Sequence, residues 1–332
     1  MRFIRNQHEH CGRIVPLEPF GALLRVTHYI PEERVERPVL TAVMDGPPGE
    51  VEVDIELVEV LLAQQHPNLA SLPVRAAERG FDNYMFRLGE SFAVRMPRSA
   101  AAARLLANEQ RWLITLSDRL PLQIPVPIRV GQPAFGFPWR WSVVPWLVGA
   151  TAEASPVAAQ EAPRLAAFLR ALHVAAPADA PRNFERAAAL PSRATAIGER
   201  LQNLERVTDV INDRIRGAWR DGLEAPNETP ATWIHGDLHA RNVLTLEGTM
   251  TGVIDWGDMT SGDPAIDLAC LWMLLPNESA RRQAQEAYDA VNDALWARAR
   301  GWAVLFGVTL LDTGLTGNAR NAAMGEQILR RI

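Results

Sequence analysis

Ile234-His235-Gly236-Asp237-Leu238-His239-Ala240-Arg241-Asn242 is the most informative segment of the sequence. It is followed by a second informative segment, Val253-Ile254-Asp255-Trp256-Gly257. The first places a carboxylate, Asp237, and an amide oxygen, Asn242, on one loop. Asp255 ends the next β-rich run, and Gly257 is expected to let the backbone turn sharply after it. Phosphoryl transfer from a nucleotide needs a carboxylate to orient the attacking hydroxyl and oxygen ligands to hold Mg²⁺. The spacing therefore predicts that Asp237, Asn242 and Asp255 face one reaction centre.

The segments on the two sides of these stretches differ in pattern. Upstream, the pattern predicts a helix, three β-rich runs, a second helix and two further strands, at 51–63, 72–76, 84–88, 92–96, 100–116, 125–127 and 141–146. Downstream it predicts helices at 163–174 and 186–223, β-rich runs at 232–234, 242–246 and 251–255, and helices from 264 onward. This order indicates an α+β fold with a small antiparallel β-sheet N-lobe at 51–147 and a larger, mostly helical C-lobe at 148–332.

Composition excludes several classes of protein. The chain has 332 residues and 36.7 kDa, enough for two packed units, and its net charge of -5 argues against nucleic-acid and membrane partners. All 34 basic residues are arginines, which excludes a Walker A loop, a Schiff-base cofactor and a lysine nucleophile. The longest apolar run, 301–311, is too short to cross a bilayer. Two cysteines and no secretory signal favour a cytoplasmic location.

The first part of the chain, residues 1–50, is an N-terminal extension without a clear period. A break rich in proline and glycine, 44–49, separates it from the first expected helix. Two interpretations stay open. The extension is either a loosely attached, disordered arm or a start-site artefact, with translation beginning at Met44.

The two motifs together carry a family resemblance. Histidine–x–aspartate–four residues–asparagine, then isoleucine–aspartate–x–glycine, resembles the catalytic and metal loops of protein kinases. The histidine–glycine–aspartate sequence at 235–237 more closely resembles the aminoglycoside phosphotransferase family of small-molecule kinases. Residues 261–269 also resemble the next motif of that family. The resemblance covers the chain from about residue 51 onward. It implies a protein-kinase-like bilobal fold, Mg²⁺, and transfer of the γ-phosphoryl group of ATP or GTP to a hydroxyl of a small molecule, with an aminoglycoside-like antibiotic as the default acceptor.

The same resemblance assigns roles in the C-lobe. Asp237 matches the catalytic base, and Asn242 and Asp255 match the metal ligands. His235 would brace the loop by hydrogen bonds. Asp267 would hold the loop through backbone amides.

In the N-lobe, the resemblance implies a nucleotide-binding role. Arg95 stands where the family usually has a phosphate-contacting lysine, and Glu109 on the following helix matches its ion-pair partner. Arginine keeps the charge but replaces a compact ammonium with a planar fork. The segment 79–83 has a single glycine, so Asn83 is expected to contact the phosphates. The hinge whose backbone would bind the nucleotide base corresponds to Val144, Pro145, Trp146 and Leu147.

Other functions compete with this interpretation. A two-metal phosphoesterase is one, because Gly-Asp-Leu-His at 236–239 mimics its first ligand motif, although the glycine–asparagine–histidine–glutamate segment it needs is missing downstream. A catalytically weak, pseudokinase-like nucleotide-binding scaffold is another, given Arg95. Within the kinase hypothesis, a macrolide or another small hydroxylated metabolite is the alternative acceptor. The protein is expected to be a monomer or a homodimer.

Overall fold

The computed structural model describes residues 50–77, 80–289 and 293–332. The chain divides into two units, 1–43 and 44–332, and all of the described residues belong to the second. The predicted N-terminal extension therefore lies outside the described residues, apart from Glu50. In the described ranges, no helix has both the length and the apolar character needed to span a membrane.

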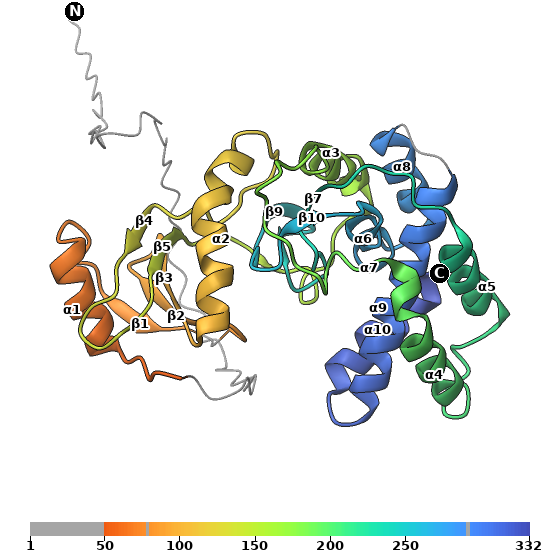
Figure 1. Ribbon diagram of the computed structural model, residues 1–332, viewed down its shortest axis with the longest axis horizontal. Helices are drawn as coiled ribbons and strands as arrows, with labels where there is room; N and C mark the ends of the chain where they lie inside the picture. Colours follow the sequence, from red (N-terminus) through yellow and green to blue (C-terminus); the bar gives the residue numbers. More distant parts are fainter. Residues whose placement is uncertain (1–49, 78–79, 290–292) are drawn as a thin grey trace, which may run out of the picture. The chain divides into compact units, whose positions relative to one another are not determined.

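The first part of the second unit is built on a five-stranded antiparallel sheet of order β1-β2-β3-β5-β4 (Figure 1). Its strands are β1 (Val74–Ala76), β2 (Asn83–Leu88), β3 (Phe92–Pro97), β4 (Arg129–Gly131) and β5 (Trp141–Pro145). Strands β2 and β3 form a hairpin whose turn contains Gly89, with φ of +58°. The predicted antiparallel meander is confirmed.

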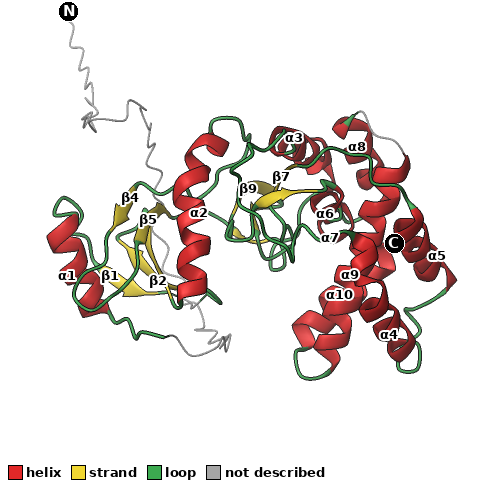
Figure 2. Ribbon diagram, viewed as in Figure 1, coloured by secondary structure: helices red, strands yellow, loops and turns green. Residues whose placement is uncertain are grey.

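Two helices accompany this sheet, α1 (Ile55–Gln65) and α2 (Ala100–Ser117) (Figure 2). Each begins at a side-chain cap: Asp54 Oδ1 accepts from the amide of Leu57 at 2.8 Å, and Ser99 Oγ accepts from the amide of Ala102 at 3.2 Å. The buried face of α2 carries Glu109 among leucines. A buried carboxylate needs a partner, so this face of α2 must meet a cation.

The second part carries two small sheets and most of the helices. Strands β6 (Ala150–Thr151), β8 (Val243–Leu246) and β9 (Thr249–Val253) form one sheet, and β7 (Thr232–Ile234) pairs with β10 (Thr260–Gly262) in the other. The helices are η1 (Ala159–Glu161), α3 (Ala162–Leu172), η2 (Leu190–Arg193), α4 (Ala194–Leu204), α5 (Asp213–Glu224), α6 (Ala265–Leu268), α7 (Cys270–Leu274), α8 (Glu278–Tyr288), α9 (Asp293–Leu315) and α10 (Ala319–Arg331).

Each part has its own hydrophobic cluster, one centred on the five-stranded sheet and a larger one on the helices. Helix α9 runs through the larger cluster and contacts α4, α5, α6 and α10. A Cβ on Gly222 of α5 would lie 2.8 Å from the Cα of Gly301 of α9, so glycine is required for these backbones to touch. These two clusters support the α+β fold with a sheet-based N-lobe and a helical C-lobe; the boundary at residue 147 stays a prediction.

The structure corrects four details of the sequence-based fold. The prediction of a strand at 125–127 is wrong. Pro125 and Pro127 have no backbone N–H to donate, and the strand begins only at Arg129. The helix predicted at 186–223 is divided into η2, α4 and α5. Asn212 starts α5 by accepting from the amides of Arg214 and Ile215 at 3.0 and 3.2 Å. The short strands β6 and β10 were not predicted.

Candidate active site

The loop that carries the first motif connects β7 to β8, and Asp267 of α6 holds it by hydrogen bonds. Asp267 is fully buried, and its two oxygens accept from the amides of His235 at 2.6 Å and Gly236 at 2.9 Å. Gly236 has φ of +83°, and a Cβ there would lie 2.9 Å from the carbonyl oxygen of Asp258. These bonds fix a left-handed turn immediately before Asp237.

His235 ties this loop to the segment that follows β9. Its Nδ1 accepts from the amide of Asp237 at 3.3 Å, so the neutral ring donates from Nε2 to the carbonyl of Ile254 at 3.0 Å. The ring also packs on Trp256, with centroids 4.7 Å apart. His235 therefore connects the backbone of Asp237 to that of Ile254, the residue before Asp255. Because both ring nitrogens are hydrogen-bonded, neither is free for proton transfer.

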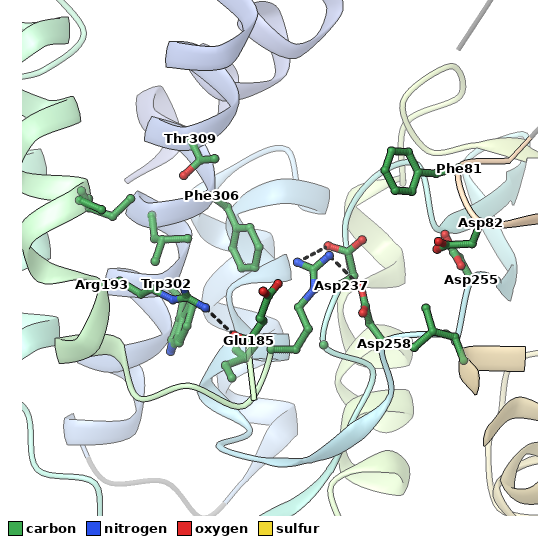
Figure 3. A pocket seen from close by; sticks show the side chains of 18 of the residues that line it. Phe81, Asp82, Glu185, Arg193, Asp237, Asp255, Asp258, Trp302, Phe306 and Thr309 are labelled. Atoms are coloured by element: carbon green, nitrogen blue, oxygen red, sulfur yellow. Dashed lines mark hydrogen bonds and ion pairs between the residues drawn. The ribbon is translucent and has the colours of Figure 1, made fainter. Parts of the chain in front are cut away.

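Asp237 lies at the centre of the site (Figure 3). Its oxygens face Arg186 Nη1 at 3.1 Å and His239 Nε2 at 3.4 Å. Burial alone would raise the pKa of Asp237, but the hydrogen bond and charge of His239, with the charge of Arg186, outweigh burial and lower this pKa to about 2. Arg186 also pairs with Asp258, Nη2 to Oδ2 at 2.8 Å, so its position does not depend on Asp237 alone.

Asn242 contacts the main chain of Asp237, and Asp255 lines the same cavity as Asp237, whereas Asn242 is absent from the walls of both cavities described below. Asn242 Nδ2 donates to the main-chain oxygen of Asp237 at 2.9 Å, which leaves the amide oxygen as its available ligand atom. Among the described residues, no cluster of three or more His, Cys, Asp or Glu side chains could hold a metal by itself. Mg²⁺ typically takes one or two protein oxygens together with water and substrate phosphates. The donor set therefore fits a cation bound together with phosphates.

Asp255 lies just beyond β9 and has φ of +62°. The sharp turn expected at Gly257 is present, because the amide of Met259 donates to the carbonyl of Trp256 at 3.1 Å. The left-handed residue before it is Asp255, a residue type that tolerates this conformation better than most. Gly257 lines the cavity next to Asp237 and Asp255, and a Cβ there would lie 3.7 Å from Glu109 Oε1.

Arg95 and Glu109 form a buried ion pair between β3 and α2. Arg95 Nη2 donates to Glu109 Oε1 at 3.1 Å, and Nη1 donates to Oε2. Burial would lower the pKa of Arg95, but the carboxylate of Glu109, helped by Asp255, raises it. Arg95 is thus the cation that the buried carboxylate of Glu109 requires, and it is also the residue predicted to contact the phosphates.

A cavity of about 390 Å³ opens beside this pair, and most of the predicted nucleotide-binding residues line it: Asn83, Arg95, Val144, Trp146 and Leu147. Pro145 does not line it, and Glu109 lies behind Arg95. The amide of Trp146 already donates to Ser91 at 2.8 Å, and Arg87 stacks on the Trp146 ring with 4.1 Å to its centroid.

A second cavity, of about 610 Å³, adjoins the first at three residues that line both, Phe81, Asp82 and Asp255. Figure 3 shows Asp237 between the end formed by Asp82 and Asp255 and the end formed by Arg193 and Trp302. Burial, with the carboxylates of Asp255 and Asp258, raises the pKa of Asp82. The acids are therefore concentrated where the two cavities meet.

Several residues of the second cavity were not found from the sequence. Arg186 comes from the irregular segment before η2, and Arg193 is the last residue of η2; neither carries a motif. Trp302 comes from the middle of α9. Asp258 lies in the loop after the second motif, and an acid three residues beyond Asp255 was a usable signal.

Solved structures of similar fold cover most of the chain. The GDP and kanamycin complex of APH(2")-IIia has a TM-score of 0.58 and 21% sequence identity over 82% of this chain and 97% of that one. The apoenzyme of macrolide 2'-phosphotransferase MphH from Brachybacterium faecium has a TM-score of 0.53 and 22% identity over 84% and 98%. The predicted protein-kinase-like fold is confirmed.

Curated relatives match only a short segment, which spans about a fifth of their length. Viomycin phosphotransferase of Streptomyces vinaceus is 43% identical over 53 residues, 15% of this chain and 18% of that protein. The uncharacterized protein YcbJ of Bacillus subtilis (strain 168) is 35% identical over 66 residues, 20% of this chain and 21% of that protein. The sequence pattern of the phosphotransferase enzyme family, in contrast, matches residues 73–302. This match covers more than half of the chain and includes both sequence motifs, so the chain belongs to the phosphotransferase enzyme family.

Proposed function

We propose that this protein transfers the γ-phosphoryl group of ATP or GTP to a hydroxyl group of a small molecule. The observation that carries the proposal is the meeting of two cavities at Asp82 and Asp255, with Asp237 lining the second cavity next to that junction. A nucleotide in the first cavity and an acceptor in the second would bring the phosphoryl group and the hydroxyl together beside Asp237. Such positioning accounts for most of the rate gain in phosphoryl transfer.

In this proposal, the chain's own residues bind and orient the two substrates. Asp237 accepts the hydrogen bond of the acceptor hydroxyl, and with a pKa of about 2 it stays ionised at neutral pH. A carboxylate of such low pKa is a weak base, so it acts mainly by orienting the hydroxyl. Asn242 and Asp255 would hold Mg²⁺, which neutralises phosphate charge when bound. Arg95, positioned by Glu109, would contact the phosphates.

For the nucleotide, we assign the first cavity to the base and phosphates. Val144, Pro145, Trp146 and Leu147 would form the hinge, and Asn83 would cover the phosphates. The solved structures of similar fold include complexes with GDP and with ATP, which supports a purine nucleotide without choosing between them. The predicted cytoplasmic location and the monomeric or homodimeric state stay predictions.

The metal assignment predicts a selective effect of Asp255→Asn. This change removes one anionic ligand, so the Mg²⁺ affinity of the nucleotide-bound protein is expected to fall by roughly tenfold or more. Nucleotide binding in EDTA should change little. Calorimetric titration of Mg²⁺ into the nucleotide complex measures the first quantity. Glu199→Gln, a change at an exposed acid of α4, is the matched control. Unchanged Mg²⁺ affinity in Asp255→Asn would remove Asp255 from the metal site.

The acceptor is assigned to the second cavity. An aminoglycoside is the default from the family resemblance, and a macrolide or another hydroxylated metabolite is the alternative. The end of the cavity away from Asp255 has aromatic walls, Trp302 and Phe306, and only one carboxylate, Glu185. Arg193 at this end donates to the main-chain oxygen of Glu185 at 2.7 Å and has no ion pair with any described residue. This balance of charge supports an acceptor with an apolar surface and few positive charges.

This charge balance makes a testable prediction about acceptors. In a coupled phosphorylation screen with ATP and GTP, a macrolide is expected to have a higher kcat/KM than a polycationic aminoglycoside. Arg193→Glu should reduce that preference by roughly tenfold, because it replaces an unpaired cation with an acid. Arg104→Glu, at an exposed arginine of α2, is the control. A wild-type preference for polycations, unaltered in Arg193→Glu, would exclude this acceptor class. Failure of all phosphorylation with either nucleotide would contradict the proposed function itself.

A further inference from the structure

A third cavity, of about 590 Å³, lies among helices of the C-lobe and shares no residue with the two cavities of the candidate active site. Four helices contribute arginines to its wall: α5, α8, α9 and α10. In Figure 1 the end of α10 lies near α5 and α9. We call it the arginine cavity, after Arg214, Arg281, Arg282, Arg300 and Arg331.

Few carboxylate side chains face these guanidinium groups. Among the described residues, the acidic side chains in the wall are Asp221 and Glu278, both exposed. Arg282 lies 3.8 Å from Glu286, whereas the other four arginines form no ion pair with an Asp or Glu side chain of the described ranges. Two other buried arginines, in contrast, have a carboxylate partner: Arg95 pairs with Glu109, and Arg298 pairs with Asp263, Nε to Oδ2 at 2.7 Å.

The contacts that these arginines do make use few of their donors. Arg281 Nη1 donates to the main-chain oxygen of Leu275 at 3.4 Å, and Arg300 Nη2 donates to that of Ile332 at 2.6 Å. Arg331 Nη1 donates to the main-chain oxygens of Trp272 and Met273, at 3.3 and 2.7 Å. Each guanidinium has five N–H donors, so most donors of the cluster stay available.

Burial and neighbouring like charges lower the pKa values of three of these arginines. Burial lowers the pKa of Arg281; the charge of Glu278 opposes this, and Arg214 and Arg300 lower the pKa further. Burial, then Arg214, lowers the pKa of Arg300, and burial, then Arg281, lowers that of Arg331. Keeping these positively charged guanidinium groups close together therefore lowers the stability of the folded protein, and a bound anion would offset this cost.

We propose that the arginine cavity is a binding site for a small molecule carrying two or more negative charges of the phosphate or pyrophosphate type. The planar fork of arginine matches phosphate geometry, and several such forks converge here from separate helices. The cavity volume is in the range of small-ligand sites. The ring of Trp296, which is partly exposed in the wall, provides an apolar surface beside the charges.

The site is tested with inorganic pyrophosphate on the full chain, in EDTA and at low ionic strength, by calorimetry. We expect one pyrophosphate per chain, bound roughly tenfold or more weakly by Arg281→Gln and by Arg214→Gln. Arg206→Gln, at an exposed arginine of the same lobe outside the cavity, should bind as the wild type does. The double variant Arg95→Met with Glu109→Leu removes the cation assigned to the nucleotide phosphates and should also bind normally, which separates this site from the candidate active site.

Further arms decide the ligand class and exclude a purely structural role. Citrate is expected to bind more weakly than pyrophosphate, and equal or tighter binding of citrate would overturn the assignment to phosphate. Arg214 is exposed, so Arg214→Gln is expected to fold even if Arg281→Gln does not. Without ligand, Arg214→Gln should unfold at the same or a higher temperature, because it relieves repulsion. Pyrophosphate binding that is absent from the wild type, or equal in the wild type and Arg214→Gln, would overturn the proposal.

Discussion

Replacement of Asp237 by asparagine is expected to lower the phosphotransfer rate by roughly 10²–10⁴-fold while nucleotide binding is retained. Asparagine has the same shape, but it lacks the negative charge that would orient the acceptor hydroxyl. The surroundings should persist, because Arg186 keeps its bonds to Asp258, at 2.8 and 2.9 Å, without the carboxylate of residue 237. The expected loss is therefore in kcat, with a small change in the KM for nucleotide.

Two measurements make this result decisive. Single-turnover phosphotransfer measures the chemical step, and nucleotide titration followed by tryptophan fluorescence measures binding. Asp179→Asn is the matched control: Asp179 is an exposed acid paired with Arg111, and it lies outside both cavities. A rate within about tenfold of the wild type would show that Asp237 does not orient the hydroxyl.

The residues that could be predicted are close together in sequence or part of one ordered motif. Asp237 and Asn242 share a loop whose spacing is dictated by the chemistry, and Asp255 follows the next strand. Arg186 and Asp258 illustrate the opposite case. Arg186 is placed by Asn183, whose side chain donates to Asp258 at 2.9 Å and caps the amide of Arg186 at 3.1 Å. This contact joins segments 75 residues apart, and no local pattern encodes it.

The errors in the fold also have local physical reasons. Apolar periodicity continues from 186 to 223, but Asn212 accepts hydrogen bonds from two amides and starts a new helix. That asparagine was a readable signal. The left-handed conformation of Asp255 was not predicted, because no local pattern marks this position, whereas the turn predicted at Gly257 is present. The hydrogen bond from the amide of Ile254 to the carbonyl of Asn242, 2.9 Å long, instead keeps the second motif beside the first up to Asp255.

Glu109→Gln is expected to destabilise the protein by about 3–5 kcal/mol, because it leaves Arg95 buried without its counter-ion. Side-chain exposure is 8% for Arg95 and 1% for Glu109, so solvent cannot replace the lost partner. Without Glu109, the remaining acids that act on Arg95 are Asp255 and Asp82. The guanidinium would be drawn toward the junction of the two cavities, so phosphotransfer should fall together with stability.

A double variant, Arg95→Met with Glu109→Leu, separates the two effects. Replacement of a buried ion pair by apolar side chains of similar volume is often neutral or stabilising, so most of the stability should return. Phosphotransfer should stay low, because no cation would face the phosphates from β3. Thermal unfolding and single-turnover rates of the wild type, the single variant and the double variant measure both quantities. Recovery of activity along with stability would show that Arg95 serves the fold of the N-lobe and does not contact the nucleotide.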